Sequence, residues 1–161
     1  MTHGGSGLDV AGVHRSPRER VFAWVSVAAG FLVAVVLSGC DRFFLYNFAY
    51  QWAPQALLLG AVLLFRPRAA ITAGVALAST VYLLAFWAWM HSLPPGQALA
   101  WLFYFVMFPG ALLGAIAAAL VSRRRPEVSA ICAGVGAAAV TLTGVAAAMV
   151  GATMKFWVRW P

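Results

Sequence analysis

Five long apolar stretches separated by short polar connections make up most of this chain, and they restrict the folds open to it. Each stretch approaches or exceeds the ~20 residues that a helix needs to cross the hydrocarbon core of a bilayer. Short connections place consecutive helices beside one another in antiparallel order. The sequence therefore predicts an all-α integral membrane protein, a five-helix transmembrane bundle formed by residues 18–161. The predicted spans cover residues 21–39, 43–65, 69–91, 98–121 and 128–154.

The composition points to the same class of protein. Hydrophobic residues make up 63% of the chain and charged residues only 9%, which leaves too little polar surface to cover a water-soluble domain. The net charge of +7 could suggest a nucleic-acid binder. However, the basic residues form small groups at the ends of apolar stretches, whereas nucleic-acid binding needs many cations on one surface. We therefore expect a lipid bilayer around the chain and no nucleic-acid partner.

Basic and aromatic residues lie at opposite ends of the predicted spans. Cationic connections stay on the cytoplasmic side, while Trp and Tyr rings prefer the headgroup region. With the N-terminus inside, the cytoplasmic segments hold eight of the 11 Lys and Arg residues, and the outer segments hold Arg42, Lys155 and Arg159. The count predicts a cytoplasmic N-terminus and an outer C-terminus in the inner membrane of a bacterium. Residues 1–17 lack apolar periodicity and are expected to form a disordered cytoplasmic tail.

The end of the first stretch carries a short motif with chemical meaning. A basic segment, an apolar run and then Leu37-Ser38-Gly39-Cys40 resemble a bacterial lipoprotein signal. The resemblance implies a diacylglyceryl group on the Cys40 thiol, removal of the preceding peptide and a mature protein with four spans. In such proteins an aspartate in the position of Asp41 is associated with retention in the inner membrane. The leader would exceed the usual ~15–30 residues, so the five-span chain with an unmodified Cys40 is the main interpretation and lipidation the alternative.

Three amide side chains recur at four-residue steps in the second stretch, namely Asn47, Gln51 and Gln55. This spacing places them on one face of a helix, and uncompensated amides are costly in hydrocarbon. They could line an outward-facing polar cavity, to which Tyr50, Tyr82, Tyr104 and His91 would contribute from the same depth. The alternative, which we favour, is hydrogen bonding between helices near the headgroup boundary.

A seam of small residues runs along one face of the fifth stretch, and a shorter one lies in the fourth. Small residues let helix backbones approach closely and gain dispersion contacts that lipid cannot replace. We therefore expect these faces to pack against neighbouring helices. The predicted seam consists of Ala130, Gly134, Ala137, Thr141, Gly144, Ala148 and Gly151 in the fifth stretch, with Gly110, Gly114 and Ala117 in the fourth.

Charged residues are missing from the middle of every predicted span, which disfavours a proton- or ion-coupled transporter. The four carboxylates have no second carboxylate at a spacing suited to acid–base catalysis. An enzyme would rest only on Asp41 and His91, which nothing in the sequence brings together. No motif predicts a metal site or a cofactor.

These features predict a non-catalytic membrane protein that works by binding a partner in or at the outer face of the membrane. It would be an accessory subunit or a protective protein, bound to another membrane protein or to further copies of itself. The alternative is a transport or lipid-handling protein that uses the polar and aromatic residues of an outward-facing cavity.

Overall fold

The computed structural model describes residues 17–93, 102–125 and 127–159, with side chains described as far as residue 152. This part of the chain is helical, which confirms the all-α prediction. The helices are α1 (Pro17–Leu37), α2 (Phe44–Leu64), α3 (Ala69–Ser92), α4 (Leu102–Arg124) and α5 (Ala130–Arg159). The predicted tail lies outside the described residues except for Pro17, which begins α1.

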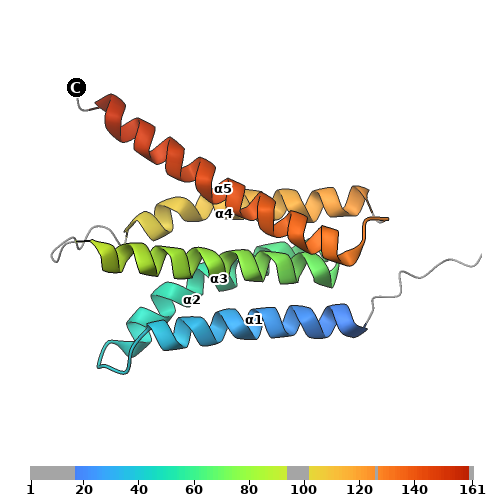
Figure 1. Ribbon diagram of the computed structural model, residues 1–161, viewed down its shortest axis with the longest axis horizontal. Helices are drawn as coiled ribbons and strands as arrows, with labels where there is room; N and C mark the ends of the chain where they lie inside the picture. Colours follow the sequence, from blue (N-terminus) through green and yellow to red (C-terminus); the bar gives the residue numbers. More distant parts are fainter. Residues whose placement is uncertain (1–16, 94–101, 126, 160–161) are drawn as a thin grey trace, which may run out of the picture.

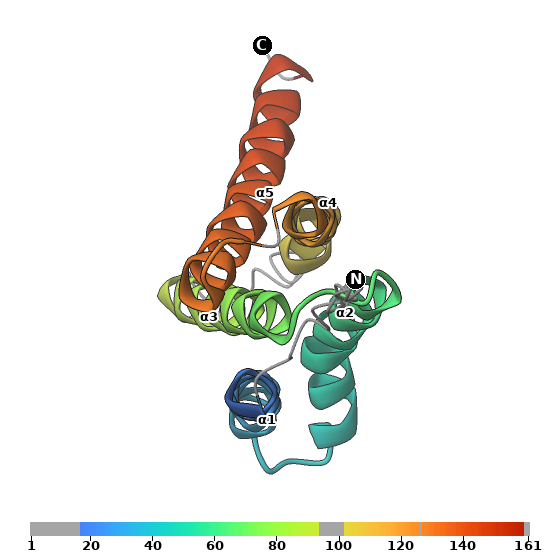
Figure 2. The ribbon, with the colours of Figure 1, turned by 90° about the vertical axis from the view of Figure 1, so that its right-hand side faces the viewer.

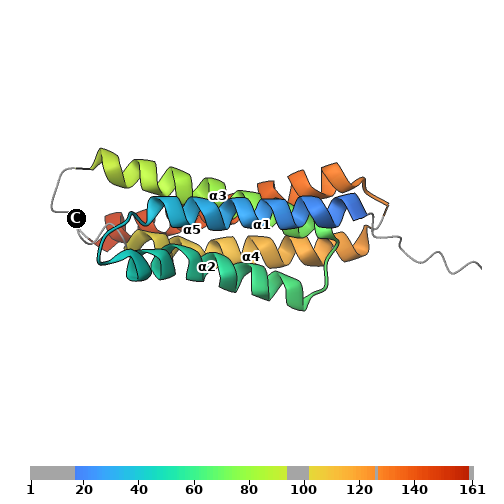
Figure 3. The ribbon, with the colours of Figure 1, turned by 90° about the horizontal axis from the view of Figure 1, so that it is seen from below.

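Consecutive helices alternate in direction along the long axis of the molecule (Figures 1 and 3). In the described residues, four helices are long and apolar enough to cross a membrane: α1, α3, α4 and α5 as far as Ala152. The remaining helix, α2, has a polar first half that contains Asn47, Gln51 and Gln55. The finding supports a multi-pass membrane protein, and it leaves the fifth crossing as a prediction.

The chain leaves α1 and α2 through residues with unusual backbone angles. Gly39 follows α1 with a φ of 71°, and Arg66 follows α2 with a φ of 47°. These left-handed conformations end a helix by turning the chain away from its axis. Pro67 comes next and lacks a backbone N–H, so the chain cannot continue as the same helix. The bounds of these two helices are therefore set by local backbone chemistry.

Helix α3 occupies the centre of the bundle, with α1 on one side and α5 on the other (Figure 2). It buries almost every residue from Ala70 to Thr80. Most of these are Ala, Gly, Ser or Thr, which is the composition that lets several helices approach one backbone at once. The larger side chains of the surrounding core, including Leu58, Val62 and Ile71, fill the space between α2, α3 and α4.

Arginine side chains join several helix ends at one end of the bundle, which we call the arginine end. The Arg68 guanidinium lies 3.5 Å from the Glu19 carboxylate of α1. It also donates a 2.7 Å hydrogen bond to the carbonyl of Val128, just before α5. Arg123 of α4 donates to the carbonyl of Phe65, at the end of α2. The start of α1 and both of the described connections at this end are thus held together.

Helix α5 runs diagonally across the bundle. Its first part packs on α3 and its middle packs on α4, and its C-terminal part diverges from both (Figures 1 and 2). Only 11% of its candidate membrane span is buried, compared with 67% for α3. Much of α5 therefore faces the surroundings of the bundle.

Candidate functional site

The predicted amide face divides into a buried part and an exposed part. Gln51 and Gln55 are almost completely buried, at 2% and 3% exposure. Asn47 is exposed, and its side-chain nitrogen donates a 3.3 Å hydrogen bond to the carbonyl of Ser38 in the turn after α1. The two glutamines therefore form the site inside the bundle, while Asn47 stabilises the connection at its edge.

Tyrosines from α3 and α4 enclose the glutamines. The Tyr104 hydroxyl donates a 3.2 Å hydrogen bond to the backbone carbonyl of Gln51. The Tyr82 hydroxyl donates a bond of the same length to the backbone carbonyl of Tyr104. The rings of Tyr82 and Tyr104 stack with centroids 5.2 Å apart, and the ring of Tyr50, from α2, also stacks with that of Tyr104 at 6.2 Å. This polar cluster links α2, α3 and α4 through hydrogen bonds and ring contacts.

Short hydroxyl side chains of α3 complete the cluster. Ser79 lies with its hydroxyl 3.5 Å from Gln55 Oε1, and Gln55 Nε2 donates a 3.4 Å hydrogen bond to the carbonyl of Gln51. Gly30 of α1 faces the same group, because a Cβ on Gly30 would lie 2.7 Å from Thr80 Oγ1 and 3.3 Å from Gln55 Oε1. All of the first four helices thus meet at this depth.

The cluster is closed rather than open. The cavity between Gln55, Ser79, Tyr82 and Tyr104 has a volume of about 10 Å³, which is close to the space that one water molecule occupies. Gln51 Oε1 is the one buried side-chain oxygen or nitrogen without a hydrogen-bond partner in the described residues. This arrangement binds helices to one another and leaves no room for a transported solute.

His91 lies away from the cluster, at the exposed end of α3. Its Nδ1 is 2.9 Å from the carbonyl of Trp87, and the imidazole lies over the Trp87 ring with centroids 3.9 Å apart. No group of three or more His, Cys, Asp or Glu side chains in the described residues could hold a metal ion. Ser79 and Thr80 of α3 and Gly30 of α1 also belong to the cluster. No sequence signal marked Ser79 and Thr80, because small residues are frequent on every face of α3, and none marked Gly30, a single glycine in an apolar helix.

Glycine crossings fix the position of α5. Cβ atoms on Gly110 of α4 and Gly144 of α5 would each overlap the other residue's carbonyl oxygen. A Cβ on Gly114 would lie 2.5 Å from the carbonyl oxygen of Val140, and a Cβ on Gly74 of α3 would overlap that of Gly134. At these points backbone touches backbone, with no space for a side chain.

The other residues of the predicted seam lie at varied positions. Ala137 and Thr141 are buried in this contact, at 2% and 1% exposure. Ala148 approaches Gly110, since a Cβ on that glycine would lie 2.7 Å from the Ala148 methyl group. Ala130 is partly buried. Ala117 and Gly151 are exposed and lie outside the crossings.

A second line of small residues follows the opposite side of α5. We call it the exposed α5 stripe, and it comprises Cys132, Gly136, Ala139, Thr143 and Ala147, all of them exposed. Their steps of three and four residues place them on one helical face. Larger side chains such as Ile131, Val135 and Met149 lie beside the stripe and are also exposed. α5 therefore has two small-residue faces, and only one of them packs within the bundle.

Cys40 is exposed in the turn between α1 and α2 and has no disulfide partner in the described residues. Removal of the preceding peptide, as the lipoprotein alternative requires, would take away all of α1. The face of α3 and α2 that Gly30 covers, including Thr80 and Gln55, would then lose its neighbour. Buried polar groups are costly to expose to lipid, so this packing favours the uncleaved chain.

Comparison with known proteins yields no relative: no protein family, characterised protein or solved structure matches this chain. Any proposal about its function therefore rests on the geometry described above.

The glycine crossing leads to a first prediction. Gly144→Leu should lower the free energy of unfolding by ~1–3 kcal/mol, because the new side chain meets the α4 backbone, which cannot move aside without breaking the crossing. Ala146→Leu adds a side chain of the same size on an exposed part of the same helix and should have little effect. Thermal unfolding in detergent compares the two variants. Equal melting temperatures would show that α5 packs through another face.

The polar cluster leads to a second prediction. Gln55→Met should lower the free energy of unfolding by at least the ~0.6 kcal/mol of an average hydrogen bond between membrane helices, because it removes the bond to Ser79. Gln51→Met should change stability less, since Tyr104 and Gln55 bond to the backbone carbonyl of residue 51, which the variant keeps. Unfolding equilibria in mixed micelles measure both. A loss at Gln51 as large as that at Gln55 would mean that the Gln51 side chain binds a partner of its own, such as a water molecule.

Proposed function

We propose that this chain is a non-catalytic, five-span protein of the bacterial inner membrane that binds another membrane-spanning helix along the exposed α5 stripe. It would act as an accessory or protective subunit, with its N-terminus in the cytoplasm and its C-terminus outside. The observation that carries the proposal is the second small-residue face of α5, all of whose residues are exposed, with Cys132 and Gly136 lining an open groove beside α4.

The physical argument depends on what small residues do in lipid. Between membrane helices there is no hydrophobic driving force, so association relies on close packing and hydrogen bonds, and small residues allow both. A position that only touches lipid tolerates a large apolar side chain, as Ile131 and Val135 illustrate at 79% and 64% exposure. Contact with lipid alone does not require small residues at the stripe. A partner helix that approaches as closely as α4 does on the other side of α5 would require them, because only small residues leave room for it.

The course of α5 supports the same proposal. It crosses α3 and α4 diagonally with only 11% of its candidate membrane span buried, so a partner could contact the exposed α5 stripe without displacing another helix. The closed polar cluster gives less support to the transport alternative, because its cavity of about 10 Å³ holds no solute larger than water.

Photocrosslinking tests the partner directly. A photoreactive residue at Ala139 should give a protein adduct of one discrete mass in native membranes, and the same residue at Ala29, exposed on α1, should give none. An adduct of twice the chain's own mass would identify a second copy, and any other mass a different protein. Thr143→Leu, introduced with the crosslinker, should remove the adduct by keeping the partner at a distance. Equal crosslinking from both sites, or none from Ala139, would contradict the proposal.

The proposed topology is supported by the position of most of the described arginines at one end of the bundle, with Arg42 at the other, and by the alternating helix directions. Reporter fusions after Arg68 and Arg125 should therefore report the cytoplasm, whereas fusions after Gly96 and at the C-terminus should report the outer compartment. A cytoplasmic signal from the C-terminal fusion would mean that one helix does not cross. The first candidate would be α2, which carries three amide side chains in its first half and is not among the four described helices that are long and apolar enough to cross.

A further inference from the structure

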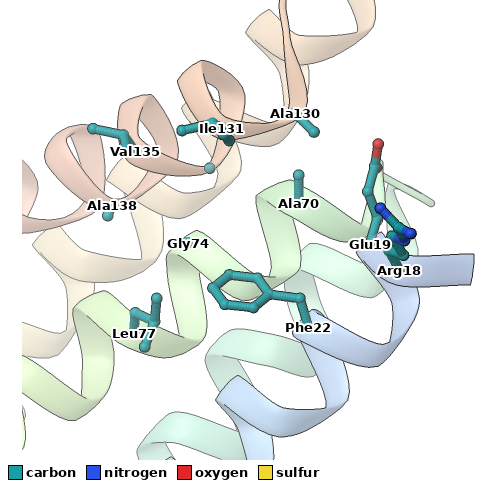
Figure 4. Close-up of a pocket in the computed structure, with 11 residues that line it drawn as sticks. Arg18, Glu19, Phe22, Ala70, Gly74, Leu77, Ala130, Ile131, Val135 and Ala138 are labelled. Carbon is teal, nitrogen blue, oxygen red and sulfur yellow. The ribbon is translucent and has the colours of Figure 1, made fainter. Parts of the chain in front are cut away.

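A deep apolar groove opens on the side of the bundle at the arginine end, between α1 and α5, with α3 as its floor (Figure 4). Its volume is about 460 Å³. The part of α3 that lines the groove consists of Ala70, Gly74 and Leu77, of which Gly74 is in contact with the backbone of α5. The walls carry Phe22, Ile131 and Val135, which are 56%, 79% and 64% exposed, so the groove is open along its length.

The length of the groove matches one leaflet of a bilayer. Along α5 its lining extends from Ala130 to Ala138, a rise of about 12 Å at ~1.5 Å per residue. One leaflet contributes about half of a ~30 Å hydrocarbon core. In a membrane, an apolar groove of this length at this depth is filled by a flexible hydrocarbon chain rather than by water.

Charge at the mouth of the groove selects the headgroup. Arg18 and Glu19 line the end of the groove nearest the start of α1 (Figure 4). The Glu19 carboxylate lies 3.5 Å from the guanidinium of Arg68, which lines a neighbouring groove, so Glu19 is already paired and Arg18 supplies the positive charge at this mouth. The surplus positive charge is complementary to a phosphate group, and basic pockets at the ends of membrane helices on the cytoplasmic side recognise anionic headgroups in this way.

We propose that this groove is a binding site for an anionic phospholipid of the cytoplasmic leaflet, with one acyl chain lying between α1 and α5 over α3 and with the headgroup phosphate bound by Arg18. The site is separate from the exposed α5 stripe, and it does not depend on whether a partner helix binds there. It also uses only residues of the folded bundle that line the groove, so it can be tested on the purified protein.

The test measures the binding of phosphatidylglycerol and phosphatidylcholine with identical acyl chains to the full-length protein in detergent, by native mass spectrometry and by thermal stabilisation. We expect phosphatidylglycerol to bind more tightly. Arg18→Gln should weaken its binding about fivefold, the contribution of one basic residue near an anionic surface, while Arg18→Lys should retain the preference. The matched control Arg124→Gln, at the same end of the bundle but outside the groove lining, should leave the preference unchanged.

A second pair of variants tests the acyl chain. Ala138→Phe places a ring in the groove and should weaken the binding of both lipids, whereas Ala29→Phe, on an exposed face of α1, should not. Soluble glycerol phosphate at the same concentration should not stabilise the protein. Equal affinity for the two lipids, a preference that survives Arg18→Gln, or full stabilisation by glycerol phosphate would each overturn the proposal.

Discussion

Direct contact between helix backbones is the constraint on which the rest of this bundle depends. In hydrocarbon, helices gain nothing from hiding apolar side chains, so they must gain dispersion contacts and hydrogen bonds that lipid does not offer. The crossing of Gly110 and Gly144 provides the closest approach, and Gly74 against Gly134 repeats it on α3. Because these two crossings lie on different neighbours, α5 is forced into a diagonal course. The exposed α5 stripe and the groove between α1 and α5 both result from this diagonal course.

The two halves of the bundle use different means of cohesion. In the half away from the arginine end, Gln55, Ser79 and Tyr104 link α2, α3 and α4, and little empty space remains. In the arginine half the contacts are apolar and small, and further grooves of about 280 and 260 Å³ lie between helices there. Arginines stabilise the very end of this half through Glu19 and backbone carbonyls. The same helices therefore pack tightly in one half of the bundle and leave grooves between them in the other half.

Much of this architecture could be predicted from the sequence, because length and hydropathy alone define membrane helices. The predicted span 69–91 agrees with α3, Ala69–Ser92, to within one residue at its end. The glycines of α4 and α5 at the crossings were also recognisable, since backbone contact needs that residue type, but their counterpart on α3, Gly74, was not predicted. Helical spacing could not reveal where the contact stops: α5 crosses at an angle, so Gly151 lies beyond the crossings. Helical spacing also could not show that Gln51 is buried and Asn47 exposed, because both lie on one helical face and burial changes with distance from the helix start. Ser79 and Thr80 gave no signal, since α3 is rich in small residues on all its faces.

The polar first half of α2 has a consequence for how the protein enters its membrane. In the proposed five-span arrangement, Gln51 and Gln55 reach hydrocarbon depth, where an unpaired amide is expensive. Ser79, whose hydroxyl bonds to the Gln55 side chain, belongs to a helix that is synthesised later, as does Tyr104, whose hydroxyl donates to the backbone carbonyl of Gln51. Under that proposal, a newly made α2 lacks the hydrogen-bond partner of the Gln55 side chain, which favours a position in the headgroup layer until the later helices are made. In the same proposal, its full crossing becomes favourable once α3 and α4 are in place, which would couple the insertion of this helix to the folding of the helices that follow it.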